Sequence, residues 1–178
     1  NTIASAQHRQ TWDATRRLFD VTAGDEILVL ATGNEAAALA DHLAAFLGTS
    51  LAADALGGAQ AVLDMTVEYV QTRRQFDRPL AAFQALKHRL SDMKTALVGA
   101  EALMWAQART AQADDADLLA FGGMKSCACQ AYQQIAEQAI QLHGGIGLTE
   151  EHPAHLYFKR AFLNEVLGGS TDHWTKAI

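Results

Sequence analysis

The feature that most constrains the fold is a helical repeat of apolar residues that runs from residue 34 to the end of the chain. Apolar side chains recur there at steps of three and four, the spacing that places them on one face of an α-helix. The repeat is interrupted at Pro79, at the polar stretch 112–117 and at Gly144–Gly145. Proline breaks a helix, and glycine readily adopts the positive φ that ends one. The pattern predicts a mainly α protein, an up-down bundle of four helices.

The first helix is expected to begin at Asn34, which can cap it, and to reach about Arg74. The second begins near Phe83, the third follows residue 117, and the fourth follows Thr149 with two glutamates in its first turn. The residues expected in the core are Leu39, Leu43, Phe46, Leu56, Ala59, Leu63, Val67 and Val70, then Phe83, Leu86, Leu90, Met93, Leu97, Ala100 and Met104, then Phe121, Met124, Ala128, Ala131, Ile135, Ala139 and Leu142. Each set forms one apolar stripe, as bundle packing requires.

The first thirty residues have a different pattern. The segments TWDATRRLFDV (11–21) and EILVLA (26–31) predict two short strands separated by a turn. Two strands do not form a stable unit by themselves. We therefore expect residues 1–33 to be the end of a β-domain and residues 34–178 to be a helical domain, in a chain that is a fragment of a longer protein.

Charge and composition exclude several classes of partner. The formal net charge is -6 and the sequence pI is about 5.6, which argues against binding to nucleic acid through a broad basic face. No apolar run approaches the roughly 20 residues of a membrane span, so no membrane insertion is predicted. The only cysteines, Cys127 and Cys129, point away from each other on a helix and suit a reducing cytoplasm.

Positive charge is nevertheless concentrated in the segment RRQFDRPLAAFQALKHR, residues 73–89. Five of the fourteen Lys and Arg residues lie there, opposed by the single acid Asp77. Guanidinium groups beside a helix N-terminus form a site for an anion such as a phosphate. The alternative is that Arg73 and Arg74 only stabilise the C-terminal end of the first helix.

A second unusual segment is QLHGGIGLTEEHP, residues 141–153. Its three glycines would let a ligand approach the backbone, and Gln141 could donate a hydrogen bond to it. Gly144 alone is explained equally well as a helix C-cap. The nearby His143, His152 and His155 lack a further spaced ligand, so no metal site is predicted.

Together the two segments resemble the acyl-CoA dehydrogenase family. Residues 73–84 match its Arg-x-Gln-Phe-Gly-x-Pro-[Leu/Ile]-x-x-Phe-Gln motif, with Asp77 in place of the glycine. Residues 141–149 match its Gln-x-x-Gly-Gly-x-Gly-[Phe/Leu]-Thr motif. The resemblance implies the C-terminal helical domain of such an enzyme, and it makes residues 1–30 the last strands of the family's middle β-domain.

The resemblance also implies FAD as the cofactor, bound partly by a neighbouring subunit. The residues that it makes candidates for FAD binding are Arg73, Gln75, Phe76, Phe83, Gln84, Gln141, Gly144 and Gly145. It implies an acyl-CoA substrate, dehydrogenated to a trans-2-enoyl-CoA, and an electron-transfer flavoprotein as acceptor. A homo- or hetero-oligomer, such as a dimer of dimers, is implied as well. A steroid or fatty acid degradation enzyme would fit this pattern.

The catalytic residue remains unassigned. The family's glutamate base lies in a Tyr-Glu-Gly-Thr segment, and this chain has Leu167-Gly168-Gly169-Ser170 there. In other members the glutamate lies in the first long helix, at the position of Leu47. Neither Leu47 nor Gly168 can abstract a proton, while Glu165, Asp172 and Asp54 are further carboxylates whose reach the sequence does not define. A subunit that lacks the base, a self-sufficient homo-oligomer with an unusual base, and a non-catalytic association module all remain open.

Overall fold

The computed structural model describes residues 3–25, 28–110 and 118–176 of the 178-residue chain. The two N-terminal strands are β1 (Ile3–Arg9) and β2 (Leu18–Ala23), and β3 (Arg74–Gln75) and β4 (Arg78–Pro79) form a second small hairpin. The helices are α1 (Gly33–Thr72), α2 (Gln84–Thr110), α3 (Leu118–His143), α4 (Ala154–Val166) and α5 (Thr171–Lys176), with short 3-10 turns η1 (Leu80–Ala82) and η2 (Gly144–Leu148). The expected mainly α fold is confirmed.

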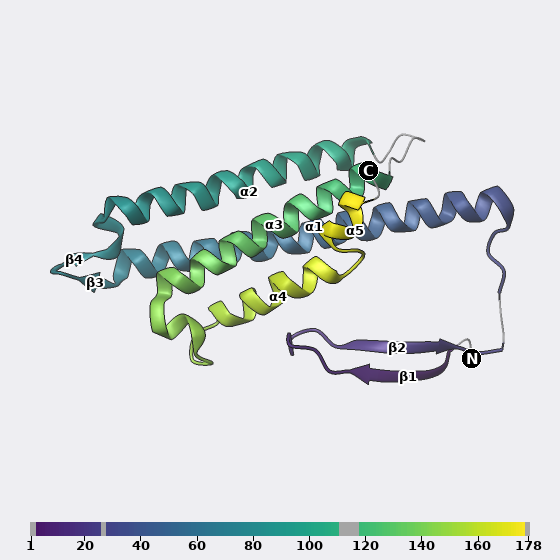
Figure 1. Cartoon of the computed structure of the whole chain (residues 1–178), viewed down its shortest axis with the longest axis horizontal. Helices are drawn as coiled ribbons and strands as arrows, with labels where there is room; N and C mark the ends of the chain where they lie inside the picture. The colour runs from purple at the N-terminus through teal and green to yellow at the C-terminus, as the bar shows by residue number, and fades with distance from the viewer. Residues whose placement is uncertain (1–2, 26–27, 111–117, 177–178) are drawn as a thin grey trace.

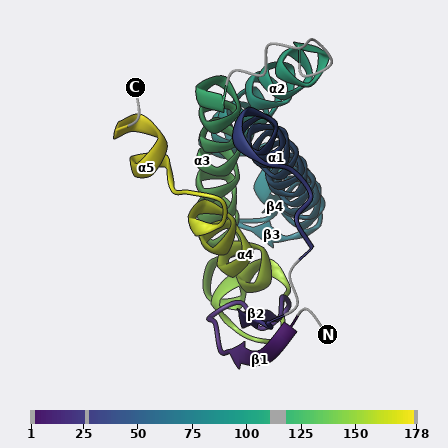
Figure 2. The same cartoon turned by 90° about the vertical axis from the view of Figure 1, so that its right-hand side faces the viewer.

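Four helices form the bundle. α1, α2 and α3 run side by side along the length of the molecule in alternating directions, and α4 packs along α3 (Figure 1). Seen end-on, the β1–β2 hairpin lies beyond α4, and α5 stands apart at one side (Figure 2). The expected up-down topology is therefore confirmed, with α3 in contact with each of the other three bundle helices.

The core is formed by the buried face of α3 and small residues of α1. All seven apolar positions expected on the third helix are buried, and Ile135 and Ala139 are completely inaccessible. On α1 the facing side chains include Ala52, Ala55 and Ala59, each completely buried. Small side chains on one helix let the axes approach closely, and the Tyr132 ring of α3 reaches Gly58 of α1.

The N-terminal half of α1 is more exposed than its C-terminal half. Its expected core residues Leu39, Leu43 and Phe46 are 39%, 54% and 69% exposed, so that part of the core prediction is not met among the described residues. By length and composition alone α1 could cross a membrane, but soluble core helices meet the same criteria. The C-terminal half of α1, from Ala52 to Val70, lies in the bundle core.

The predicted N-terminal strands were largely wrong. β1 pairs with β2 in an antiparallel hairpin whose first strand was missed, and residues 28–31 are not a strand. Residues 11–17 form a turn instead, because the Asp13 carboxylate accepts hydrogen bonds from the Thr15 backbone N–H (2.9 Å) and hydroxyl (2.6 Å). This side chain to backbone bonding competes with strand pairing.

Two helix boundaries also differ from expectation. α4 begins at Ala154, so Glu150 and Glu151 precede it rather than occupy its first turn, and Pro153 is the residue before the helix. The short helix α5 was not anticipated. Its start is fixed by Glu165, whose carboxylate accepts hydrogen bonds from the backbone N–H (2.7 Å) and hydroxyl (3.1 Å) of Thr171. The expected polar turn at 112–117 lies outside the described residues.

Candidate functional site

The hairpin β3–β4 turns the chain sharply at one end of the bundle. The backbone N–H of Leu80 donates to the carbonyl of Arg73 (2.8 Å), which closes the hairpin at its base. Phe76 and Asp77 at the tip both have positive φ, 52° and 62°, as a two-residue hairpin of the type I′ kind requires. Asp tolerates this conformation, but it is strained for a bulky Phe. The Phe76 ring lies at the tip of the hairpin and is 85% exposed.

The hairpin side chains form a layered aromatic and cationic surface. The Phe76 and Phe83 rings meet edge to face, with centroids 6.3 Å apart. The guanidinium of Arg78 lies over the Phe83 ring, 3.9 Å from its centroid. Arg74 donates to the carbonyl of Asp77 (2.5 Å). Arg74 and Arg78 therefore stabilise the hairpin itself, whereas Arg73 at its base is exposed.

The polar candidates around the hairpin also face outward. Gln75 and Gln84 are exposed, and the amide nitrogen of Gln84 lies 3.4 Å from Nε2 of His88, one turn further along α2. The structure thus brings five of the predicted FAD-binding residues to one end of the bundle: Arg73, Gln75, Phe76, Phe83 and Gln84. A planar aromatic group and an anion are the chemistry that such a surface can bind.

The glycine segment ends α3 at the same end of the bundle (Figure 1). Gly144 has a φ of 65°, in the left-handed region that favours glycine, and no atom lies within 4 Å of where a Cβ would be. Gly145 is equally open, and Gln141 is exposed one turn earlier. The backbone is bare on this side, so a ligand can approach it closely.

A ring stack joins the two segments. Tyr69, one turn before Arg73, packs on His143 with ring centroids 4.4 Å apart, and its hydroxyl donates to the His143 carbonyl (3.3 Å). The ring of His152 also packs against His143, with centroids 4.3 Å apart, and it meets the Tyr69 ring edge to face at 6.2 Å. Nδ1 of His143 donates to the Ala139 carbonyl (2.8 Å), while its Nε2 has no partner. Burial lowers the pKa of His143 and nearby His152 lowers that pKa further, although the bond to the Ala139 carbonyl opposes both; burial and nearby His155 lower the pKa of His152.

The two positions at which the resemblance places a glutamate base line a single cavity. Leu47 of α1 and Gly168, after α4, both line a space of about 260 Å³. Its remaining walls are Ala44, Gly48, Phe121, Gly122, Lys125 and Trp174. None of these eight described lining residues is a carboxylate. The cavity is instead mostly apolar, with one buried lysine.

Lys125 holds the glycine loop that forms one wall of this cavity. The side chain is 1% exposed, and its Nζ donates to the carbonyls of Glu165 and Gly169, both at 2.6 Å. The Glu165 carbonyl belongs to the last turn of α4, where helix carbonyls lack partners within the helix. Trp174 completes the wall, because its indole N–H donates to the Gly168 carbonyl (3.2 Å).

The three other candidate carboxylates are engaged elsewhere. Glu165 caps α5, as described above, and Asp172 pairs with Lys176 on the surface (2.5 Å). Asp54 accepts hydrogen bonds from Asn164 (2.7 Å) and Arg16 (3.1 Å). None of the three lines the cavity at Leu47 and Gly168.

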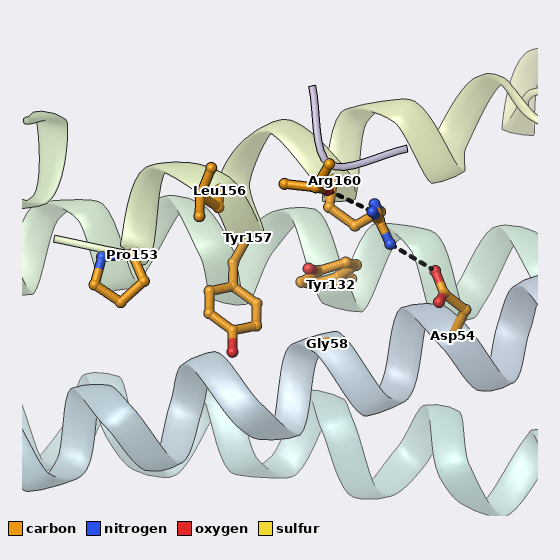
Figure 3. A pocket seen from close by; sticks show the side chains of 8 residues that line it. Asp54, Gly58, Tyr132, Pro153, Leu156, Tyr157 and Arg160 are labelled. Atoms are coloured by element: carbon orange, nitrogen blue, oxygen red, sulfur yellow. Dashed lines mark hydrogen bonds and ion pairs between the residues drawn. The ribbon is translucent and has the colours of Figure 1, made fainter. Parts of the chain in front are cut away.

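Asp54 belongs to a second cavity, of about 300 Å³, between α1, α3 and α4 (Figure 3). Arg160 of α4 crosses its rim, 3.9 Å from Asp54, and also donates to the buried carboxylate of Asp13 (2.5 Å). Burial raises the pKa of Asp13, but the bonds from Arg160 and Thr15 outweigh burial and hold it below its usual value. These ion pairs tie the β1–β2 turn to the bundle.

Comparison with known proteins identifies the family. Residues 47–178 match the sequence profile of the acyl-CoA dehydrogenase C-terminal domain. The chain belongs to the acyl-CoA dehydrogenase family. It is 38% identical over 157 residues to the acyl-CoA dehydrogenase IpdE2 of Mycolicibacterium smegmatis, a match that covers 88% of this chain and 46% of that protein. This acyl-CoA dehydrogenase chain thus spans about half the length of the curated relatives it matches.

Solved structures of acyl-CoA dehydrogenases share the fold. The ChsE4-ChsE5 complex from Mycobacterium tuberculosis superposes with a TM-score of 0.72 at 29% identity, over 92% of this chain and 40% of that chain. A glutaryl-coenzyme A dehydrogenase bound to glutaryl-CoA gives a TM-score of 0.82 over 98% of this chain and 46% of that chain. At 22% identity the second likeness concerns the fold alone. Acyl-CoA dehydrogenases of this kind are FAD enzymes.

Sequence reasoning missed the buried polar residues of the acyl-CoA dehydrogenase bundle. Lys125 follows Phe121 by four residues and therefore lies on its core-facing side, which was an available signal. Tyr132 gave the same signal, because it follows the expected core residue Ala128 by four residues, whereas Asp13 and Arg160 gave no comparable signal.

Proposed function

We propose that this chain is a subunit of an FAD-dependent acyl-CoA dehydrogenase, that it contributes FAD-binding surface shared with a partner chain, and that it does not supply the base. The observation that carries the proposal is the cavity at Leu47 and Gly168. Both positions at which the resemblance places the base line that cavity, and no carboxylate is among its described lining residues. A general base must lie within hydrogen-bond reach of the proton that it removes.

The residues at the hairpin end fit the cofactor. Exposed Arg73 offers a guanidinium to a pyrophosphate, Phe76 and Phe83 offer ring faces, and Gly144–Gly145 offers bare backbone. When bound, FAD would supply the acceptor for the hydride, and with it the two electrons, that leaves the acyl-CoA. The chain's own residues would bind and orient it. That the ChsE4-ChsE5 structure is a complex of two named proteins supports a heteromeric assembly of this kind.

The test is the flavin content of the full-length chain, purified alone and with its partner subunit. We expect little bound flavin in the chain alone and stoichiometric flavin in the complex, read from the visible absorption spectrum. Full flavin occupancy in the chain alone would favour a self-sufficient homo-oligomer. Flavin in neither preparation would favour a non-catalytic association module and contradict the proposal.

The assignment of Arg73 to the FAD-binding surface is tested with two variants. Arg73→Ala should weaken flavin retention about tenfold or more, since a hydrogen bond to a charged group contributes roughly 1.5 to 3 kcal/mol. Arg109→Ala is the matched control, because Arg109 is an exposed arginine in the last turn of α2, at the far end from the hairpin. Equal flavin affinity in the two variants would exclude Arg73 from the site.

A further inference from the structure

The last carbonyl of α3 is held by a side chain from another helix. This carbonyl belongs to His143, and its peptide bond leads into Gly144, the first residue of the exposed glycine segment. Carbonyls in the last turn of a helix have no donor within the helix, so they need one from outside. The hydroxyl of Tyr69, on α1, donates to this carbonyl (3.3 Å). The orientation of this peptide bond sets the direction in which the bare backbone at Gly144 and Gly145 leaves the bundle.

The backbone of the same tyrosine forms part of the base of the hairpin. Tyr69 lies in the last turn of α1, and its own carbonyl accepts the backbone N–H of Arg73 (2.8 Å) and the hydroxyl of Thr72 (3.1 Å). Tyr69 therefore contacts the hairpin segment through its main chain and the glycine segment through its side chain. Among the hydrogen bonds between described residues, the one from the Tyr69 hydroxyl is the only one that joins α1 to residues 143–149.

Two histidine rings restrict the direction of this hydroxyl. The Tyr69 ring packs on that of His143 with an interplanar angle of 32°, and it meets the His152 ring edge to face. His143 is anchored by its bond to the Ala139 carbonyl (2.8 Å). His152 is anchored because its Nδ1 accepts the backbone N–H of Ala154 (3.2 Å), the first residue of α4. Packed aromatic rings stabilise one another beyond their buried area, so the phenol is held with its hydroxyl directed at the last α3 carbonyl.

We infer that Tyr69 is a positioning residue of the FAD-binding surface, whose hydroxyl and ring fix the glycine segment relative to Arg73. This inference rests on the proposed function, because it takes both segments to bind the same cofactor. Tyr69 is half-buried, and it acts through the His143 peptide bond rather than by contact with FAD. Loss of its hydroxyl keeps Arg73 and the glycines present but allows their relative placement to vary.

The test is the FAD affinity of the full-length chain in complex with its partner subunit. The flavin-free complex is titrated with FAD, and binding is read from the quenching of flavin fluorescence. Tyr69→Phe keeps the ring stack and removes only the hydroxyl, so we expect about threefold to tenfold weaker binding, as the loss of one net hydrogen bond gives. Tyr132→Phe is the matched control and should bind FAD as the wild type does. Tyr132 is a buried tyrosine of α3, about three turns before His143, and its hydroxyl has no hydrogen-bond partner.

A double-mutant cycle separates positioning from a general loss of stability. If Tyr69 acts by fixing the glycine segment relative to Arg73, the effect of Tyr69→Phe on FAD affinity should shrink to less than about twofold when Arg73 is already alanine. A purely structural role would lower the unfolding midpoint and leave the effect on FAD affinity the same in both backgrounds.

The wild-type complex distinguishes failure of this inference from failure of the proposed function. A wild-type complex that does not bind FAD would contradict the proposed function and, with it, the role given to Tyr69. Where the wild type binds FAD, equal affinity in Tyr69→Phe and Tyr132→Phe would overturn the inference alone. An effect of Tyr69→Phe that persists unchanged in the Arg73→Ala background would overturn it as well.

Discussion

Removing the Lys125 ammonium should destabilise the loop that forms one wall of the cavity at Leu47 and Gly168. Lys125→Met keeps the side-chain length but deletes two hydrogen bonds of 2.6 Å to the carbonyls of Glu165 and Gly169. Hydrogen bonds to charged groups contribute roughly 1.5 to 3 kcal/mol each, and part of this is offset because a buried charge no longer has to be desolvated. We expect a loss of about 3 kcal/mol in the free energy of unfolding, measured by urea denaturation.

The matched control is Lys94→Met. Lys94 is exposed and donates to the side chain of Gln60 (2.8 Å), so its loss should cost about 0.5 kcal/mol or less. Hydrogen exchange adds a local readout, because Lys125→Met should speed exchange at residues 167–171 before other parts of the bundle. If both variants unfold at the same urea concentration and exchange alike, the role given to Lys125 is wrong.

Three further predictions concern pH, the backbone at Leu47 and Gly168, and the ion pair between Asp13 and Arg160. Because burial lowers the pKa of His143 and of His152, the stability that they contribute is present above about pH 6.5 and is lost as the pH falls below it. Urea titrations at pH 7.5 and 5.5 should show this loss, and His143→Phe should reduce it; equal pH dependence would exclude the histidine stack. Gly168→Glu should cost about 1 to 2 kcal/mol because φ there is 67°, whereas Leu47→Glu on a regular helix should cost less, and thermal unfolding of the two variants compares them. Asp13→Asn should destabilise by about 3 kcal/mol by leaving a partly buried guanidinium without its carboxylate, and an unchanged unfolding midpoint would contradict the ion pair.

The helices were predictable because their signals are local. The step of three and four and the break at Pro79 depend only on neighbouring residues, and α1 and α3 begin or end within two residues of the expected points where these are described. The β1–β2 hairpin was not predictable in the same way. The turn at Asp13 is stabilised partly by Arg160, which lies 147 residues away in the sequence.

The candidate site likewise has one part that was predictable from the sequence and one part that was not. The exposed residues at the hairpin end were proposed as a site from two sequence motifs, and the structure gathers them at one end of the bundle. That Leu47 and Gly168 share one cavity could not be read from the sequence, since 121 residues separate them. The position of the Tyr132 hydroxyl could not be predicted from the sequence either. It lies against Gly58, and only the packing of the helices brings these two residues together.

The central claim, that this chain supplies no base, is tested most directly by removing its candidate carboxylates in the reconstituted complex. Glu165→Gln, Asp172→Asn and Asp54→Asn are compared with the wild type by steady-state turnover of an acyl-CoA that the complex oxidises, with folding checked by circular dichroism. Loss of a general base costs typically 10²- to 10⁴-fold in rate. We predict that each folded variant retains turnover within about tenfold of the wild type. A loss of about a hundredfold or more in any one folded variant would place the base on this chain and contradict the account.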